Sequence, residues 1–392
     1  MKAWKWIFYI TLLLFPFGQL ASFNFPLKGF FFRLHLIDVS CLFFVLYWFF
    51  LIKKTSPPSF FKPLAVFGVI AGMSLTVKAF SLPFGELVPA FFYLVRLYCW
   101  IMFFWAMRDF IKKEKININI LLVCEGVAVA VFSLWQYLFL SDTRFLYYSG
   151  WDDHLFRAIG TFLDPAFNGL ILVLSFIVGL NKLLDKSKNN KTFFMIALIL
   201  IGTTVGLTFS RMSYLLLLLS LFIVLVTKKK YKLFFLLTSV FLLLVFLLPK
   251  PTGEGVDLLR KTSGSAKINN YRQTLSIAKD NLFLGVGYNA LRGEAFRRGF
   301  LQAKNWQTSH AGAGADNSFL FVLATTGVFG FFSYLYFWLT IVKKTIRQKE
   351  AFFLTTNICL LISAFFVNSL FYPWILFWWG ICLADFTAGT EA

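Results

Sequence analysis

Three ionisable side chains flank apolar runs on the same predicted side of the membrane, and their types suit phosphate chemistry. Arg211 ends the short connection TFSR between two apolar runs, Arg272 lies in the polar stretch YRQTLSIAKD, and Asp316 precedes an apolar run. An Arg guanidinium keeps its charge, and its planar fork matches phosphate oxygens bidentately. Two such groups would hold a polyprenyl diphosphate and offset the charge that grows on it as it leaves. A carboxylate near them would accept the proton of an attacking sugar hydroxyl.

Each of these residues also has an ordinary structural interpretation. An Arg at a helix end commonly extends its side chain toward the membrane surface, and an Arg in a loop is commonly solvated. The sequence Asp-Asn-Ser before an apolar helix is a typical N-cap cluster, and such a cap contributes about 1 kcal/mol. The proposed chemistry therefore depends on the three residues acting together.

The elements that must position these residues are membrane spans. Of 392 residues, 59% are hydrophobic and 14% are charged, whereas a soluble globular chain is about 25% charged. A span needs about 20 apolar residues. We therefore expect an all-α polytopic membrane protein with about twelve transmembrane helices. The windows that qualify are 4–20, 34–52, 63–81, 86–107, 118–140, 165–181, 193–209, 212–227, 232–248, 317–341, 351–367 and 370–387.

Basic residues orient these spans, because loops rich in Lys and Arg remain in the cytoplasm. More than half of the 38 Lys and Arg residues lie near the N-terminus or in alternate connections. This pattern predicts that both termini are cytoplasmic. The net charge of +20 then reflects topology and attraction to anionic membrane lipids. Since no soluble basic face is predicted, we expect no nucleic-acid partner.

One connection is much longer than the others and divides the chain into three parts. Residues 1–248 hold helices one to nine, residues 249–316 form a large outer loop with short helices, and residues 317–392 hold helices ten to twelve. The loop contains NNYRQTLSIAKDNLFLGVGYNAL, with apolar residues at helical spacing, and it carries ten basic residues against four acidic ones before Asp316. Positive charge on the outer side is not a topology signal, so it indicates an anionic ligand.

Further residues could take part on the outer side. Tyr147, Tyr148, Trp151 and Trp306 suit sugar stacking, although aromatic residues at the membrane surface also act as anchors. Charges inside spans are costly and often functional. Such charges include Arg96 in the fourth span and Lys78 in the third, which could pair with Glu86. The three His residues are scattered and no C-x-x-C occurs, so neither a metal site nor a cofactor is predicted.

Four segments occur in the order found in the O-antigen ligase / O-antigen polymerase family. They are GTFLDPAFNGLIL (160–172), TFSRMSYLLLLLS (208–220), YRQTLSIAKDNLFLGVGYNAL (271–291) and DNSFLFVLATTGVFGFF (316–332). Together with the twelve-span plan and the large outer loop, they make the chain from about 150 to 345 resemble that family. The resemblance implies a GT-C-like fold. It also implies metal-independent, inverting transfer of a glycan from undecaprenyl diphosphate to an acceptor hydroxyl.

The resemblance further implies where the protein works and with what. The reaction would take place on the outer face of the bacterial inner (plasma) membrane. The partners would be an undecaprenyl-diphosphate-linked glycan, a glycan or lipid acceptor, and membrane lipids, and we expect a monomer. Arg211 and Arg272 would bind the diphosphate. Arg157, Tyr271 and Asn317 are further candidates for substrate binding.

The catalytic base is the point at which this chain departs from the family. The family has a His directly before Asn at the start of the tenth span, and here that position is Asp316. An unperturbed Asp has a pKa of about 3.9 against about 6.5 for His, so it is the poorer base in water. Partial burial would raise its pKa, and two nearby Arg would lower it. His310 is an alternative base, and a third interpretation is that the chain has lost activity.

A transporter or flippase of lipid-linked sugar is the competing function, because twelve spans also suit secondary transporters. Such transporters usually show two related halves and interrupted helices near the midplane. We find neither in the sequence, and the large loop falls between spans nine and ten. The sequence therefore favours a glycosyltransferase, with ligase and polymerase as alternatives.

Overall fold

The computed structural model describes residues 2–27, 30–114, 116–185, 190–249, 254–301, 306–307 and 314–390. The predicted alternative base, His310, lies outside these residues. Each of the twelve predicted windows overlaps one helix. These helices are α1 (Lys2–Leu14), α2 (Leu36–Leu51), α3 (Phe61–Ala79), α4 (Phe84–Glu114), α5 (Ile118–Phe139), α6 (Pro165–Leu183), α7 (Lys191–Leu207), α8 (Arg211–Thr227), α9 (Tyr231–Leu247), α12 (Ser318–Arg347), α13 (Ala351–Ser363) and α14 (Pro373–Thr390).

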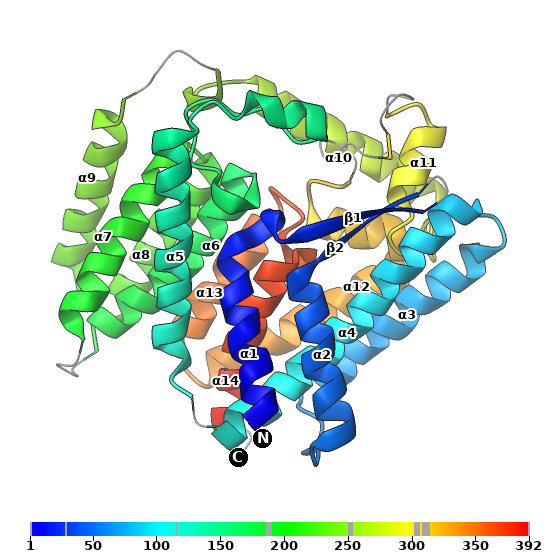
Figure 1. The fold of residues 1–392 in the computed structure, drawn as a ribbon, viewed down its shortest axis with the longest axis horizontal. Helices are drawn as coiled ribbons and strands as arrows, with labels where there is room; N and C mark the ends of the chain where they lie inside the picture. The colour runs from blue at the N-terminus through cyan, green and yellow to red at the C-terminus, as the bar shows by residue number, and fades with distance from the viewer. Residues whose placement is uncertain are drawn as a thin grey trace.

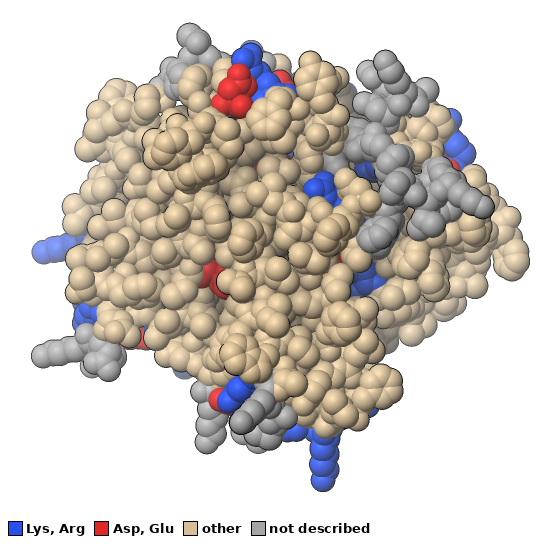
Figure 2. All heavy atoms as spheres, in the orientation of Figure 1, with Lys and Arg blue, Asp and Glu red and all other residues tan. Residues whose placement is uncertain are grey.

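Apolar helices make this a membrane protein. In the described part of the chain, α3, α4, α5, α6 and α12 are long and apolar enough to cross a membrane, and α2, α7, α8, α9 and α13 are apolar but shorter. Large side chains such as Phe50, Leu138 and Ile199 are exposed, which suits contact with lipid. Charged side chains are sparse over the middle of the face shown in Figure 2. That all twelve helices cross the membrane stays a prediction.

The large connection contributes two helices at one end of the bundle. Both termini lie at the opposite end from α10 (Thr262–Asp280) and α11 (Leu291–Arg297), as Figure 1 shows. We call the end that carries α10 the outer end, after the predicted orientation. The helix expected in the loop is confirmed as far as Asp280, and the GVG motif after it is not helical. The predicted division of the chain at residues 248 and 317 stays a prediction.

A β-hairpin at the outer end makes the all-α prediction incomplete. The window 4–20 is α-helical only to Leu14, and a 3-10 turn leads into β1 (Ser22–Leu27), which pairs antiparallel with β2 (Phe30–His35). Pro16 cannot donate a hydrogen bond to a continued α-helix. Gly18 has a φ of 53°, and a Cβ there would lie 2.6 Å from the carbonyl oxygen of Thr161. The chain therefore turns at this point, and the hairpin crosses the outer end (Figure 1).

Helix α6 is the most enclosed of these five long helices, with 72% of its apolar window buried. It packs on its neighbours through small residues. A Cβ on Gly126 of α5 would lie 2.3 Å from Cβ of Ser175, and one on Gly169 would lie 2.1 Å from Oγ of Ser213 on α8. Close approach of small residues drives the association of helices in lipid. This packing fixes α8, whose first residue is Arg211.

The GVG motif of the outer loop docks into a break in α12. Gly327 interrupts the helix with φ 65° and ψ −167°. The Val286 N–H donates to the Ala324 carbonyl at 2.9 Å, and the Val328 N–H donates to the Leu282 carbonyl at 2.8 Å. Irregular backbone at membrane depth is tolerated where other protein groups satisfy it. The loop therefore replaces the hydrogen bonds that α12 loses at its break.

A hydroxyl from a third helix completes this junction. Ser74 of α3 lies within hydrogen-bonding distance of the carbonyls of Leu284 and Thr325, at 2.6 and 2.7 Å from its Oγ. Gly285 has a φ of 70°, and a Cβ there would lie 2.3 Å from the backbone of Thr325. The GVG motif (residues 285–287) and the break at Gly327 therefore form one unit, the Gly327 junction, which joins the loop to α12 and α3.

Candidate functional site

Arg211 occupies the predicted hairpin tip between α7 and α8. Ser210 caps α8 and accepts a hydrogen bond from the Ser213 N–H at 3.3 Å. The exposed Arg211 side chain donates to the Arg260 carbonyl at 3.1 Å and to Ser263 Oγ at 2.6 Å. Arg211 thus links the start of α8 to the N-terminal end of α10.

Two further arginines gather at this point. Arg157 donates through Nε to the Thr208 carbonyl at 3.0 Å and through Nη2 to the Phe209 carbonyl at 3.2 Å, which fixes its guanidinium under the start of α8. Burial and the charge of Arg260 lower the pKa of Arg157 to about 10. We call Arg157, Arg211 and Arg260 the α8 arginine cluster. Arg157 and Arg260 interact electrostatically, and Arg211 contacts the backbone of Arg260. Arginines gathered in this way suit a multiply charged anion.

The cap of α12 is Asn317, so the prediction of Asp316 as the N-cap is wrong. The Asn317 side chain accepts hydrogen bonds from the backbone N–H groups of Phe319 and Leu320 at 2.8 and 3.0 Å. The chain enters the helix in extended conformation at Asn317, so its carboxamide, not the preceding carboxylate, reaches these N–H groups. Asn317 is 4% exposed. The side-chain oxygen of Asn317 is thus used to cap α12.

Asp316 is left available for other interactions. Its backbone N–H donates to Asn270 Oδ1 of α10 at 2.9 Å, and its carboxylate lies 3.9 Å from Lys267 Nζ. Burial raises the pKa of Asp316, the charge of Lys267 opposes this, and the charge of Asp164 adds to it. A partly buried carboxyl with a raised pKa is a better proton acceptor than a fully solvated one.

Two more carboxyl groups stand near Asp316. Asp164 caps α6 and accepts hydrogen bonds from the N–H groups of Ala166 and Phe167 at 2.6 and 2.9 Å. Burial, together with the charges of Asp164 and Asp316, raises the pKa of Asp152 to about 6. Asp164 also interacts electrostatically with Arg157. The carboxyl groups therefore lie between Asp316 and the α8 arginine cluster.

The remaining candidates lie on α10. Tyr271 interacts with the side chain of Asn317, which opposes the rise in the pKa of Tyr271 caused by burial. This contact joins α10 to the start of α12. Arg272 is exposed, and five residues separate it from Lys267, which places it about 140° around the helix. The buried residues of α10 are Thr274, Ile277 and Ala278. Arg211 and Asp316 thus share the inner side of α10, whereas Arg272 lies on its outer side.

A cavity of about 800 Å³ lies at the outer end of the bundle, and we call it the outer cavity. Its walls come from the β-hairpin, the first four turns of α4, residues 147–151 and residues 288–293. The aromatic residues predicted for sugar stacking, Tyr147, Tyr148, Trp151 and Trp306, line it. Gly314 also lines it, so the chain passes from the cavity wall to Asp316 within two residues.

Two charged residues in this cavity were missed by the sequence reasoning. Arg33 of β2 and Arg292 of α11 line the cavity together with Arg96 of α4. Arg33 is the single charge in the apolar run GFFFRLHL, and such a charge is the same signal that identified Arg211. No comparable signal separates Arg292 from the other basic residues of the loop. In the described part of the chain, no three His, Cys, Asp or Glu side chains are grouped so that they could hold a metal ion.

The family model described as O-antigen ligase matches residues 196–335. The matched region contains Arg211, Arg272 and Asp316, along with α10 and the Gly327 junction. It confirms the resemblance to that family over the three later segments, and the segment 160–172 lies outside the match. No match to a curated protein was found.

Proposed function

We propose, from the match of residues 196–335 to the O-antigen ligase family model, that this chain is a membrane glycosyltransferase. It transfers a glycan from undecaprenyl diphosphate to an acceptor hydroxyl on the outer face of the inner membrane. The reaction is inverting and needs no metal. The observation that carries the proposal is that Arg211 and Asp316 both contact the inner side of α10, Arg211 through Ser263 and Asp316 through Asn270.

In the proposed reaction, the α8 arginine cluster holds the diphosphate of the donor. Asp316 accepts the proton of the acceptor hydroxyl as the hydroxyl oxygen forms a bond to the anomeric carbon. The bond from this carbon to the diphosphate oxygen breaks, and its electron pair leaves with the diphosphate. The arginines offset the charge that develops there. A single displacement of this kind inverts the anomeric configuration.

Replacing Arg211 with Ala tests this proposal. We expect transfer to fall by about 10²–10³-fold, because one of the charges that stabilise the leaving diphosphate is lost. The measurement is conversion of lipid-linked donor by purified protein, without an ion gradient, so that a transporter would give no product. The matched control is Lys279→Ala, which removes an exposed charge from the outer side of α10. Equal transfer by Arg211→Ala and the control would refute the proposed role.

Arg272 is tested in the same assay, because its predicted role as a diphosphate ligand stays a proposal. A loss of transfer in Arg272→Ala comparable to that in Arg211→Ala would support this role. Transfer by Arg272→Ala at the same rate as by the control Lys279→Ala would exclude it.

A ligase and a polymerase differ in their acceptor. Loss of a ligase from cells leaves long lipid-linked chains, and loss of a polymerase leaves single repeats.

The pH dependence of transfer is expected to report on Lys267. Asp316 must be ionised to accept a proton, so transfer rises with pH through the pKa of Asp316 and is lost below it. Lys267 favours the ionised carboxylate. Lys267→Met should therefore raise the pKa of Asp316 further and move the acidic limb of kcat/KM to higher pH, by about one unit at most, since both groups are partly solvated. An acidic limb at the same pH in Lys267→Met and Lys279→Met would contradict this.

A further inference from the structure

The outer cavity has the size of a ligand site and extends toward the membrane interior. Its volume of about 800 Å³ falls within the range of about 300–1,000 Å³ that is usual for ligand pockets. Gly85 and Leu97 of α4 both line it. Twelve residues of helix span about 18 Å. A ligand of several sugar units would therefore fit along α4.

Three arginines from three different elements line this cavity. Arg33 donates through Nε to Ser22 Oγ at 2.9 Å and through Nη2 to the Gln19 carbonyl at 3.0 Å, and its guanidinium lies 4.9 Å from the centre of the Trp151 ring. Arg292 donates to the carbonyl of Gln307. Burial lowers the pKa of both arginines. Because a charged side chain is costly to bury, such arginines favour an anionic ligand.

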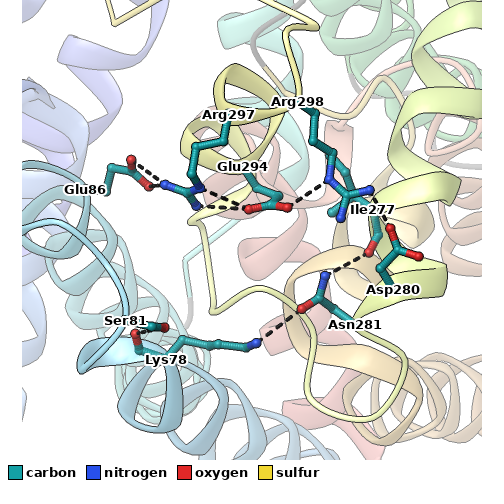
Figure 3. Close-up of polar contacts among 9 residues, drawn as sticks. All are labelled: Lys78, Ser81, Glu86, Ile277, Asp280, Asn281, Glu294, Arg297 and Arg298. Carbon is teal, nitrogen blue, oxygen red and sulfur yellow. Dashed lines mark hydrogen bonds and ion pairs between the residues drawn. The ribbon is translucent and has the colours of Figure 1, made fainter.

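The acidic residue in the cavity wall is already neutralised. Glu86 accepts from Arg297 Nη1 at 2.7 and 2.8 Å, and Arg297 in turn contacts Glu294 at 3.1 Å. Figure 3 shows that this chain of contacts continues through Arg298 to Asp280. These ion pairs attach α11 to α4 and α10. They leave the positive charge of Arg33 and Arg292 uncompensated by Glu86, whereas Arg96 is paired with Asp38.

Lys78 does not take part in this neutralisation, so the predicted pair of Lys78 with Glu86 is wrong. The Lys78 ammonium donates to Asn281 Oδ1 at 3.1 Å. Figure 3 shows the Lys78 side chain extending toward Asn281 and not toward Glu86. Arg297 is closer to Glu86, because α11 lies against the start of α4.

Arg96 has a donor that nothing in the described part of the chain satisfies. Its Nε donates to Asp38 at 2.9 Å, and its Nη2 is buried without a hydrogen-bond partner. Asn368 also lines the cavity, and its buried Oδ1 likewise has no hydrogen-bond partner in the described part of the chain. A buried polar atom without a partner costs free energy. A ligand with both acceptor and donor groups would satisfy the two atoms.

The other lining residues indicate a saccharide as this ligand. Trp100, Trp151, Tyr288 and Tyr372 present rings, and Asn24 and Asn289 present amides. Flat apolar rings beside a few placed polar groups are typical of sites for ligands that carry both kinds of surface. A sugar has such surfaces, and an acidic sugar adds the anion that the arginines require.

We propose that the outer cavity binds an anionic saccharide through Arg33, Arg96 and Arg292, separately from the α8 arginine cluster. The anion is a carboxylate or phosphate on the sugar. That this saccharide is the acceptor glycan rests on the proposed function, and its binding does not. The glycan substrate of this protein is then acidic, and the cavity holds it beside Asp316, two residues from Gly314 in the cavity wall.

The test is isothermal titration calorimetry of the purified full-length protein with trigalacturonate and with maltotriose, a neutral trisaccharide. We expect trigalacturonate to bind about tenfold more tightly or better. Arg292→Gln should weaken its binding by a similar factor. A second variant, Arg96→Gln with Asp38→Asn, removes the guanidinium without leaving a buried charge unpaired. Lys279→Gln is the control for net charge, and we expect it to bind trigalacturonate as the unaltered protein does. The melting temperature of each variant shows whether it is folded.

Equal Kd values for the two trisaccharides would overturn the proposal, and so would unchanged trigalacturonate binding in both arginine variants. Farnesyl diphosphate could instead displace trigalacturonate, and do so equally in Arg211→Ala. That result would assign the cavity to the lipid diphosphate and would also overturn the proposal. Competition by galacturonate and by glucose 6-phosphate shows whether the cavity prefers a carboxylate or a phosphate on the sugar. Either preference supports the proposal. Binding is measured without donor, so binding by a chain that transfers no glycan would refute only the proposed function.

Discussion

Replacing Asp316 with Asn is expected to lower glycan transfer by about 10²–10⁴-fold, the usual contribution of a general base. Asn is close to Asp in shape but cannot take a proton from the acceptor hydroxyl. The backbone N–H of residue 316 still donates to Asn270, and Asn317 still caps α12, so the fold is retained. The measurement is the rate of product formation at saturating donor and acceptor, together with donor affinity, which we expect to change little.

His310→Ala is the control for this prediction, since His310 is the other predicted base. We expect it to transfer glycan at nearly the rate of the unaltered protein. Normal transfer by Asp316→Asn with a large loss in His310→Ala would reverse the assignment. The asparagine cap sharpens this comparison, because a defect in Asp316→Asn cannot be explained by loss of the helix cap.

Replacing Gly327 with Ala is expected to lower the free energy of unfolding by about 2–6 kcal/mol. A Cβ at this position would lie 2.1 Å from the Phe283 carbonyl oxygen, and the φ of 65° is one that L-residues rarely adopt. Backbone strain of this kind costs about 1–3 kcal/mol, and overpacking costs a similar amount. Because whole domains are stable by about 5–15 kcal/mol, this change removes a large share of the stability.

The check is the melting temperature of the purified protein in detergent, with Gly202→Ala as the matched control. Gly202 lies in α7, where a Cβ would meet only Phe176 at 3.6 Å, an ordinary contact. We expect the control to melt at the temperature of the unaltered protein. If Gly327→Ala and Gly202→Ala melt alike, the close docking of the GVG motif at α12 is wrong.

The positions of the helices were predictable because lipid imposes a simple rule on the sequence. Every span must be apolar over a fixed length, and each predicted window overlaps a helix. The hairpin tip at Arg211 was predictable for a related reason, since few residues separate two apolar runs there. The hairpin β1–β2 was missed because its apolar residues continue those of the flanking helices, so hydropathy shows no boundary.

The candidate site was predictable only in part, because its geometry depends on contacts between distant segments. Nothing local to Asp316 tells that Asn317 takes the cap or that Lys267, fifty residues earlier, lies beside it. Helical spacing alone did not tell which side of α10 faces the bundle, so Arg272 was expected at the diphosphate and Lys267 was not identified. The outer cavity unites the hairpin, α4 and α11, and no sequence pattern joins those three elements.

The Gly327 junction also bears on which wall of the outer cavity can move. Hydrogen bonds at the junction join the loop that follows α10 to α3 and α12. The ion pairs Arg297–Glu86 and Arg298–Asp280 join α11 to α4 and to α10. These connected helices should therefore move little relative to one another when a ligand enters the cavity. The opposite wall holds residues 147–151, with Tyr147 and Tyr148 at 66% and 92% exposure. We expect a long glycan to enter the outer cavity by displacing this aromatic segment. The loop bearing Trp151 would then move while the helices of the other wall stay in place.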